Sequence, residues 1–236
     1  MQENLRKNLD EDLERVEKAT HRAGRRPDDV KLVAVSKTQP AEVLREALAV
    51  GVTVFGENRV QEAEAKIVEI GRNSAEWHLI WHLQSNKVRR AVQLFDVIQS
   101  VDSVELAGRL ERICIEEERA ELPIFVQVDL AGEETKSGIS ERDLSELVES
   151  LTACNRLKFN GLMIVPPYFE NTDDVRPFFR RLREIRDNLL SQNAFANGKG
   201  ELSMGMSHDF EVAIEEGATV VRVGTAIFGA RSYYSR

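Results

Sequence analysis

The sequence has little cysteine, no long apolar run and no excess of positive charge. Its two cysteines, Cys114 and Cys154, fall in separate helix-like segments, so we expect reduced thiols in a cytoplasmic protein. No stretch approaches the roughly 20 apolar residues of a membrane helix, and the N-terminus lacks the apolar region of a signal peptide. A net charge of −8 disfavours nucleic acid and anionic membranes as partners.

Motifs for several cofactors are also missing. His78 and His82 are four residues apart, as paired metal ligands on a helix are, but they flank a strand-like apolar stretch. We therefore expect no metal site. There is no Gly-rich dinucleotide fingerprint and no nucleotide-binding P-loop. The 236 residues are 42% hydrophobic and 31% charged, and this length suits one α/β barrel domain of about 200–250 residues.

Strand-like and helix-like patterns alternate along the chain. Leu5, Leu9 and Leu13 are spaced as on one face of a helix and predict a leading helix within residues 1–25. The predicted strands are 31–36, 52–56, 77–81, 96–100, 124–130, 159–165, 201–204 and 219–223. The predicted helices between them are 41–50, 59–70, 86–94, 103–119, 141–153, 173–191 and 208–217.

Several of these strands are almost continuously apolar, which is typical of a parallel sheet buried on both faces. Eight such strands alternating with helices favour a closed (β/α)₈ barrel, the TIM barrel, over an open sheet. We expect the barrel to occupy residues 30–230 and the whole chain, 1–236, to form one domain.

Lys37 directly follows the apolar run of the first predicted strand, VKLVAVSKTQ. In this barrel fold the active site lies at the C-terminal ends of the strands. A lysine at the edge of an apolar pocket loses hydration of its charged form, which favours the neutral, nucleophilic amine that a Schiff base needs. A surface lysine just beyond a strand is the alternative, and the local sequence leaves both open.

Two loops carry residues suited to a phosphate group. Ser203 and Ser207 flank a glycine after the seventh predicted strand, and Gly224 and Thr225 follow the eighth. Barrel enzymes frequently hold phosphate in these two loops, and N–H groups at a helix start attract the dianion. The alternative is that these residues only form turns. Their coincidence at both expected loops favours a phosphate site.

Three further residues are candidates for the same site. Arg222 lies within an apolar run, and we expect it to point into the barrel mouth because a buried unpaired charge is costly. An ion pair with Glu57 or Asp129 is the alternative. Asn58 either binds a ligand or caps the next helix. Met163 either forms an apolar wall or packs in the core.

Six segments resemble the pyridoxal phosphate homeostasis protein family, in order and over nearly the whole chain. They are LVAVSKTQP, FGENRVQEAEAK, WHLIWHLQSNK, DLAGEETKSGI, GLMIVPP and LSMGMSHDFEVAIEEGATVVRVGTAIFGAR. Members of this family resemble the N-terminal barrel of bacterial alanine racemase. The resemblance implies an alanine racemase-like barrel that binds pyridoxal 5′-phosphate (PLP) and acts in vitamin B6 homeostasis.

The resemblance also implies roles for individual residues. Lys37 holds PLP covalently as a Schiff base, and Arg222 approaches the ring nitrogen or the phosphate. Asn58 and Met163 lie beside the ring. The residues around the phosphate are Ser203, Ser207, Gly224 and Thr225. One position departs from the family pattern: where a glycine or another small residue is usual, this chain has Trp81, which narrows the site mouth or stacks near the ring.

These features favour a PLP-binding protein without a catalytic residue over an enzyme. A cation at the ring nitrogen disfavours protonation of that nitrogen and weakens the electron sink on which PLP catalysis depends. In alanine racemase, as the resemblance implies, the second catalytic base is a tyrosine of an additional C-terminal domain. This sequence ends at Arg236 directly after the barrel, with Tyr233 and Tyr234 in its tail.

We therefore expect a PLP carrier whose partners are PLP and PLP-dependent apo-enzymes. The alternative is a PLP-dependent amino-acid racemase that takes its second base from the barrel or from a dimer partner. A Schiff-base aldolase without cofactor is a third, remote class. Because barrel racemases dimerise partly through the additional domain, we expect this chain to be a monomer.

Overall fold

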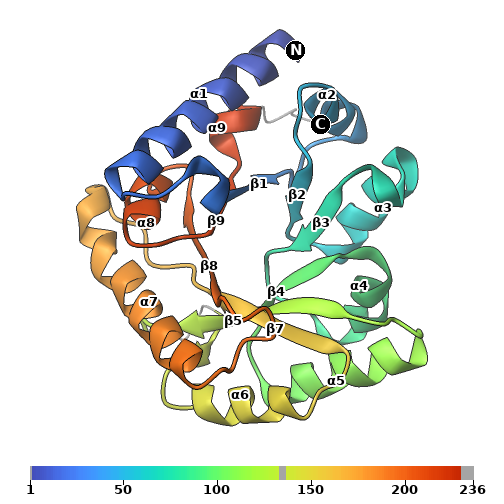
Figure 1. The fold of residues 1–236 in the computed structure, drawn as a ribbon. Coiled ribbons are helices and arrows are strands. Elements are labelled where there is room, and N and C mark those ends of the chain that lie inside the picture. The colour runs from blue at the N-terminus through green and yellow to red at the C-terminus, as the bar shows by residue number, and fades with distance from the viewer. Residues whose placement is uncertain (1, 133–136, 230–236) are drawn as a thin grey trace.

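A computed structural model describes residues 2–132 and 137–229, which form a closed parallel barrel surrounded by helices (Figure 1). The described strands are β1 Lys31–Val35, β2 Val54–Glu57, β3 Glu76–Leu79, β4 Val97–Val101, β5 Leu122–Asp129, β6 Ile139–Ser140, β7 Leu157–Met163, β8 Glu201–Met206 and β9 Val220–Val223. They pair in parallel in the order β4-β3-β2-β1-β9-β8-β7-β5-β6, and an additional β4–β5 pairing closes the barrel. The predicted TIM barrel is confirmed.

Helices form the outer ring of the molecule (Figure 1). They are α1 Gln2–Arg22, α2 Ala41–Ala49, α3 Val60–Ile70, α4 Val88–Leu94, α5 Val104–Glu116, α6 Leu144–Thr152, α7 Arg176–Ser191, α8 Phe210–Glu215 and α9 Thr225–Phe228. Short 3₁₀ turns occur at Pro27–Asp29, Arg72–Ser74, Ser85–Lys87 and Thr172–Val175. Within the described residues, no helix is both long and apolar enough to cross a membrane.

The longer outer helices are amphipathic and bury one apolar face in the interior of the molecule. In α5 the buried side chains include Leu106, Leu110 and Ile113, which are spaced three or four residues apart and therefore share a face. The Ser103 side chain caps this helix by accepting a hydrogen bond from the Leu106 N–H. Cys114 on α5 is buried and Cys154 is partly buried, and both are free thiols.

The inside of the barrel is a separate region from this outer core. A small apolar cluster fills part of it, formed by Val33, Val54, Val97, Phe125, Met163 and Val220. Inward-facing side chains alternate with outward-facing ones along each strand. Several of the other buried barrel residues are polar, including His78, Gln99, Ser203 and Arg222.

The end of β8 depends on Gly205. Its φ is +92°, and a Cβ atom there would lie 2.6 Å from the Ala213 Cβ and 2.9 Å from the Phe210 Cα. Only glycine allows this conformation together with so close an approach of α8. The strand consequently runs to Met206, two residues beyond its predicted end, with a shifted register against β9 between Ser203 and Met206.

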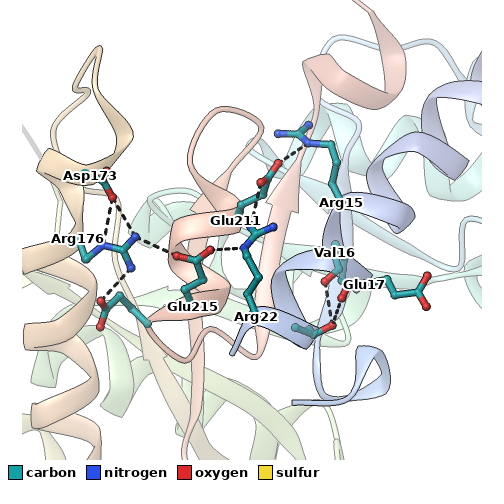
Figure 2. A network of polar contacts seen from close by, with 10 residues as sticks. Arg15, Val16, Glu17, Arg22, Asp173, Arg176, Glu211 and Glu215 are labelled. Carbon is teal, nitrogen blue, oxygen red and sulfur yellow. Dashed lines mark hydrogen bonds and ion pairs between the residues drawn. The ribbon is translucent and has the colours of Figure 1, made fainter. Parts of the chain in front are cut away.

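The leading helix α1 packs against α8 and α9 and belongs to the helical shell (Figure 1). Its residues Leu5, Leu9 and Val16 are buried. Figure 2 shows the polar contacts that join it to its neighbours. Arg15 donates to Glu211 and Arg22 to Glu215, both at 2.7 Å.

The same network continues to α7. Arg176 donates to Glu215 on α8 at 2.9 Å and to Asp173 in the preceding turn at 2.9 Å (Figure 2). Thr20, near the end of α1, donates back to the carbonyl oxygens of Val16 and Glu17. The carboxylates of α8 therefore link the first helix of the chain, α1, to α7.

Candidate functional site

A cavity of about 290 Å³ opens at the C-terminal ends of the barrel strands. That volume lies near the lower end of the range for small-molecule sites. Six of the residues predicted from the sequence line it: Lys37, Asn58, Ser207, Arg222, Gly224 and Thr225. They follow or end four different strands, so the barrel brings together residues separated by up to 188 positions.

Lys37 lies two residues beyond the end of β1 and is partly buried in the cavity wall. The chain turns sharply after it, since Thr38 has a positive φ of 66°. On its N-terminal side, Ser36 is fully buried, and its N–H donates to the Gly56 carbonyl at 3.0 Å. The backbone around the lysine is thereby fixed.

A buried ion pair stands behind Lys37 and Asn58. The Lys66 ammonium donates to Glu57 Oε1 at 2.7 Å and to the Ser36 carbonyl oxygen at 2.8 Å. The Ser36 hydroxyl donates to the same Glu57 oxygen at 2.5 Å. Burial raises the pKa of Glu57, and Lys66 opposes that rise. Because Ser36 precedes Lys37 and Glu57 precedes Asn58, this cluster holds two cavity residues through their chain neighbours.

Arg222 is 3% exposed and forms part of the cavity wall. Its guanidinium donates from Nη1 to the Ser203 hydroxyl oxygen at 2.6 Å and from Nη2 to the Ile164 carbonyl oxygen at 2.7 Å. Burial lowers the pKa of Arg222 to about 10, so the side chain remains charged at neutral pH.

The alternative partners considered for Arg222 are engaged elsewhere. Glu57 pairs with Lys66, and Asp129 Oδ1 accepts the N–H groups of Ala131 and Gly132 at 2.9 and 3.0 Å. The sequence could not distinguish these cases, because which strand ends face one another depends on the register of the closed barrel.

The loops after β8 and β9 meet at one side of the cavity. The Ser207 hydroxyl oxygen accepts the Gly224 N–H at 3.1 Å, and α9 begins at Thr225. The first N–H groups of a helix have no acceptor within it. Asp209 orders the β8 loop by accepting the Met206 N–H at 2.6 Å, and burial raises the pKa of this carboxyl group.

Two predicted ligand residues lie deeper than the cavity wall. Ser203 and Met163 are both fully buried, and neither is among the residues that line the cavity. Ser203 contacts Arg222, and Met163 packs in the apolar cluster inside the barrel. The sequence indicates that these strand residues face inward, but the depth of each layer depends on strand stagger, which the sequence pattern does not report.

Other residues at the mouth were not predicted as ligands. Ile80, Met206, His208 and Phe228 line the cavity, and all but Met206 lie outside strands. The His208 ring lies 5.2 Å from that of Tyr168, and its Nε2 contacts the carbonyl oxygens of Phe169 and Glu170 at 3.2 Å. An exposed loop histidine carries no periodic signal in the sequence.

Trp81, singled out in the sequence, also lines the cavity and is 52% exposed. Its carbonyl oxygen accepts the Ser100 hydroxyl at 2.7 Å, which fixes the backbone beneath the indole at the mouth. Tyr233 and Tyr234 lie outside the described residues, as do residues 133–136 of the DLAGEETKSGI segment. In the described part of the chain, no group of three or more His, Cys, Asp or Glu side chains is arranged to hold a metal ion.

The chain matches the family model for the alanine racemase N-terminal domain over residues 8–232. It is 46% identical to the pyridoxal phosphate homeostasis protein of Aquifex aeolicus over 221 residues, which is 94% of this chain and 96% of that protein. It is 40% identical to the protein of the same name from Escherichia coli K12, covering 96% of each chain.

Two solved structures are also similar to this chain. PipY of Synechococcus elongatus, determined with PLP bound, superposes with a TM-score of 0.80 at 40% identity, covering 91% of this chain and 100% of that one. Alanine racemase from Corynebacterium glutamicum superposes with a TM-score of 0.64 at 18% identity, covering all of this chain and 62% of the racemase. The second likeness concerns the fold alone.

Proposed function

Because the chain belongs to the pyridoxal phosphate homeostasis protein family, which has the alanine racemase N-terminal fold, we propose that it binds PLP reversibly as a Schiff base on Lys37 and serves in the supply of this cofactor. The observation that supports this most is the single cavity around Lys37, lined by five further residues that the sequence assigned to PLP. The PLP-bound structure of PipY supports it as well.

The groups around the cavity match the chemistry of PLP. Lys37 supplies an amine for the aldehyde, and Arg222 supplies a buried cation. The Ser207 oxygen accepts the Gly224 N–H, which leaves the Ser207 hydroxyl proton for the phosphate, and Thr225 adds a backbone N–H at the start of α9. Ile80 and Trp81 offer apolar surface for the faces of the ring. When bound, PLP supplies an electrophilic aldehyde and a ring able to accept electrons.

We propose further that binding occurs without catalytic turnover. Arg222 is held by two hydrogen bonds and keeps its charge, since its pKa is about 10. A guanidinium only donates hydrogen bonds, so at the ring nitrogen it favours the unprotonated form. An incoming amine that formed its own C=N bond to the aldehyde carbon would free the Lys37 amine, and the cofactor would then be available to PLP-dependent apo-enzymes, which we regard as the partners of this protein.

The amino-acid racemase remains the second candidate, because one titratable cavity residue besides Lys37 offers a base. His208 lines the mouth, and its Nε2 is directed toward two carbonyl oxygens. That arrangement favours a proton on Nε2 and leaves Nδ1 as the basic nitrogen. Racemisation of an amino acid at enzyme-like turnover, lost in both Lys37→Ala and His208→Asn, would establish the racemase and contradict the carrier.

The first test is the visible absorption spectrum of the purified protein before and after addition of PLP. We expect a Schiff-base band in the wild type and none in Lys37→Ala. Lys18→Ala is the matched control, because Lys18 is an exposed lysine of α1 that pairs with Glu14, and it should retain the band. If neither wild type nor control develops a band with PLP in excess, the proposal fails.

We also propose that the protein acts as a monomer. Light scattering should then give a mass near 26.7 kDa. A stable mass of twice that value would contradict the monomer without affecting the assignment of Lys37.

A further inference from the structure

A line of hydrogen-bonded side chains crosses the inside of the barrel, starting at the cavity. Arg222 Nη1 donates to Ser203 Oγ at 2.6 Å, and the Ser203 hydroxyl donates to Gln99 Oε1 at 2.6 Å. The other end of that amide, Gln99 Nε2, lies 2.7 Å from His78 Nδ1. The line therefore passes from β9 through β8 and β4 to β3 without a break.

The line continues to the opposite end of the barrel. His78 Nε2 lies 2.7 Å from Glu76 Oε1, and the Lys31 ammonium contacts the two Glu76 oxygens at 2.9 and 3.1 Å. Lys31 and Glu76 are the first residues of β1 and β3, and both line a second cavity of about 370 Å³ at the N-terminal ends of the strands. The two ends of the barrel are thus joined by side chains alone.

The chemistry of the two ends fixes the direction of every bond between them. A guanidinium only donates and an ionised carboxylate only accepts. Ser203 Oγ must accept from Arg222, so its own proton goes to Gln99 Oε1, and the Gln99 amide group donates to His78 Nδ1. His78 then carries its single proton on Nε2 and donates it to Glu76.

The reverse orientation does not satisfy the same groups. If Gln99 turned its amide around, His78 would have to donate from both ring nitrogens and so be charged. Burial lowers the pKa of His78, which opposes that charge. The hydroxyl proton of Ser203 would also lose its acceptor. One arrangement of protons therefore fits the whole line.

Water has little access to the middle of this line. Ser203 and Gln99 are fully buried and His78 is 1% exposed. The apolar cluster that includes Val97, Phe125 and Met163 occupies part of the same interior, and Val97, Phe125 and His78 line the second cavity at its N-terminal end. A buried polar group that loses its partner is not compensated by solvent, so a break at any member disturbs the groups on both sides of it.

We propose that Gln99 and His78 are positioning residues that act through Ser203 to hold the Arg222 guanidinium at the wall of the Lys37 cavity. Neither residue lines that cavity. They fix the Ser203 oxygen as an acceptor aimed at Arg222, and Glu76 anchors the line at the far end of the barrel. The identification of PLP as the ligand of this cavity rests on the function proposed above.

The first experiment measures PLP affinity in Gln99→Met. Methionine has nearly the size and flexibility of glutamine but makes neither amide hydrogen bond. We expect the dissociation constant for PLP to rise about tenfold and the Schiff-base band to shift, although Lys37 is unchanged. The matched control is Val97→Ala, which leaves a gap in the same interior on the same strand, beside His78, but removes none of the hydrogen bonds of the line.

The control separates positioning from a general loosening of the barrel. The dissociation constant of Val97→Ala for PLP should stay within about twofold of the wild-type value. This should hold even if Val97→Ala and Gln99→Met lose equal amounts of free energy of unfolding. Wild-type affinity in Gln99→Met, or an equal weakening in both variants, would overturn the proposal.

The second experiment needs no bound cofactor. Nitrogen-15 NMR of the cofactor-free protein should show His78 neutral at pH 7, with its proton on Nε2. In Gln99→Met the His78 Nδ1 signal should move, and the Arg222 guanidinium signals should broaden as its rotation is released. A ring with its proton on Nδ1, a charged ring, or unaltered Arg222 signals would overturn the proposal.

The two proposals fail in different ways. If the wild type never develops a PLP band, the proposed function fails, and the NMR experiment alone decides whether the line positions Arg222. If the band forms normally in the wild type and in Gln99→Met, the positioning role fails and the assignment of PLP to Lys37 stands.

Discussion

At the scale of single residues, the site depends on groups that do not reach the cavity. The Glu57–Lys66 pair is the clearest case, since both side chains are almost fully buried and each lies beside the backbone of a cavity residue. Such pairs are held in place by mutual attraction and by hydrogen bonds that satisfy the remaining oxygens. Here the Ser36 hydroxyl donates to the same oxygen as Lys66, Glu57 Oε1, and among the described residues Glu57 Oε2 has no hydrogen-bond partner.

Removing one partner of this pair should be far more damaging than removing both. We expect Lys66→Met to lower the free energy of unfolding by about 3–5 kcal/mol, because it leaves the Glu57 carboxylate buried without a counter-charge. Urea denaturation followed by circular dichroism checks this. The double variant Glu57→Gln/Lys66→Met should recover much of the loss, and a double variant no more stable than Lys66→Met would contradict the explanation.

The residue scale is also where prediction from sequence was weakest. Lys37 and Gly224 could be assigned because they directly follow apolar strands, and both line the cavity. The sequence offers no reason to place Ser203 deeper than Ser207, since both flank the same glycine after the seventh predicted strand. Only the depth of Ser203 in the barrel keeps it out of the cavity wall. Gln99 and His78 were not predicted to contact each other, because cross-strand neighbours depend on register and stagger.

At the scale of elements, α1 is attached to the barrel in two ways of unequal strength. Its apolar face buries Leu5, Leu9 and Val16, and its polar face carries Arg15 and Arg22 into the ion-pair network with α8. Exposed ion pairs contribute little, whereas burial of a leucine contributes much more. The apolar contact should therefore dominate the docking of this helix.

This difference can be measured with two variants of the same helix. Leu9→Ala should lower the free energy of unfolding by about 2–5 kcal/mol, because it removes buried methyl groups and leaves a gap. Arg22→Ala, whose side chain is 49% exposed, should cost about 0–1 kcal/mol. Denaturant titrations of both variants check the ranking. If Arg22→Ala cost as much as Leu9→Ala, the network in Figure 2 would be the main attachment.

Elements were predicted well from the sequence for a physical reason. Strands buried on both faces give nearly continuous apolar runs, as several do here, and each of the eight barrel strands overlaps a predicted strand. The short strand β6, Ile139–Ser140, was missed because two residues carry no periodicity. The extension of β8 to Met206 was missed because it depends on Gly205 lying against α8, a contact between elements.

At the scale of the whole molecule, buried titratable groups make the stability depend on pH. His78 has a lowered pKa because burial penalises its charged form. When the protein unfolds below pH 6.5, His78 regains its ordinary pKa and takes up a proton. The unfolded state therefore binds more protons than the folded state, and the free energy of unfolding decreases as the pH is lowered. Glu76, whose pKa is lowered to about 2 chiefly by the hydrogen bond from His78, adds to this loss below pH 4.5.

Other buried carboxyl groups act in the opposite direction. Burial raises the pKa of Glu57, Asp102 and Asp209, so the folded state binds more protons there and gains stability as the pH falls. The wild-type pH profile is therefore a sum of opposing contributions. The contribution of His78 has to be isolated by comparison with a variant that cannot titrate at that position.

We expect the wild type to lose more stability than His78→Gln between pH 7.5 and pH 5.5. The difference between the two free energies of unfolding should change by up to about 1.4 kcal/mol per pH unit below pH 6.5, the limit for one proton. Urea titrations at several pH values check this. Parallel pH profiles for the two proteins would show that folding leaves the pKa of His78 unchanged and would contradict the prediction.

The protonation of the two thiols determines which side chains of this protein can react with an aldehyde. Cys114 is buried and its pKa is raised by burial to about 11, and burial also raises the pKa of Cys154. At neutral pH only about one Cys114 side chain in ten thousand is then a thiolate, the form that attacks electrophiles. Under the function proposed above, the aldehyde of PLP would therefore react with amines of this protein and not with its two thiols.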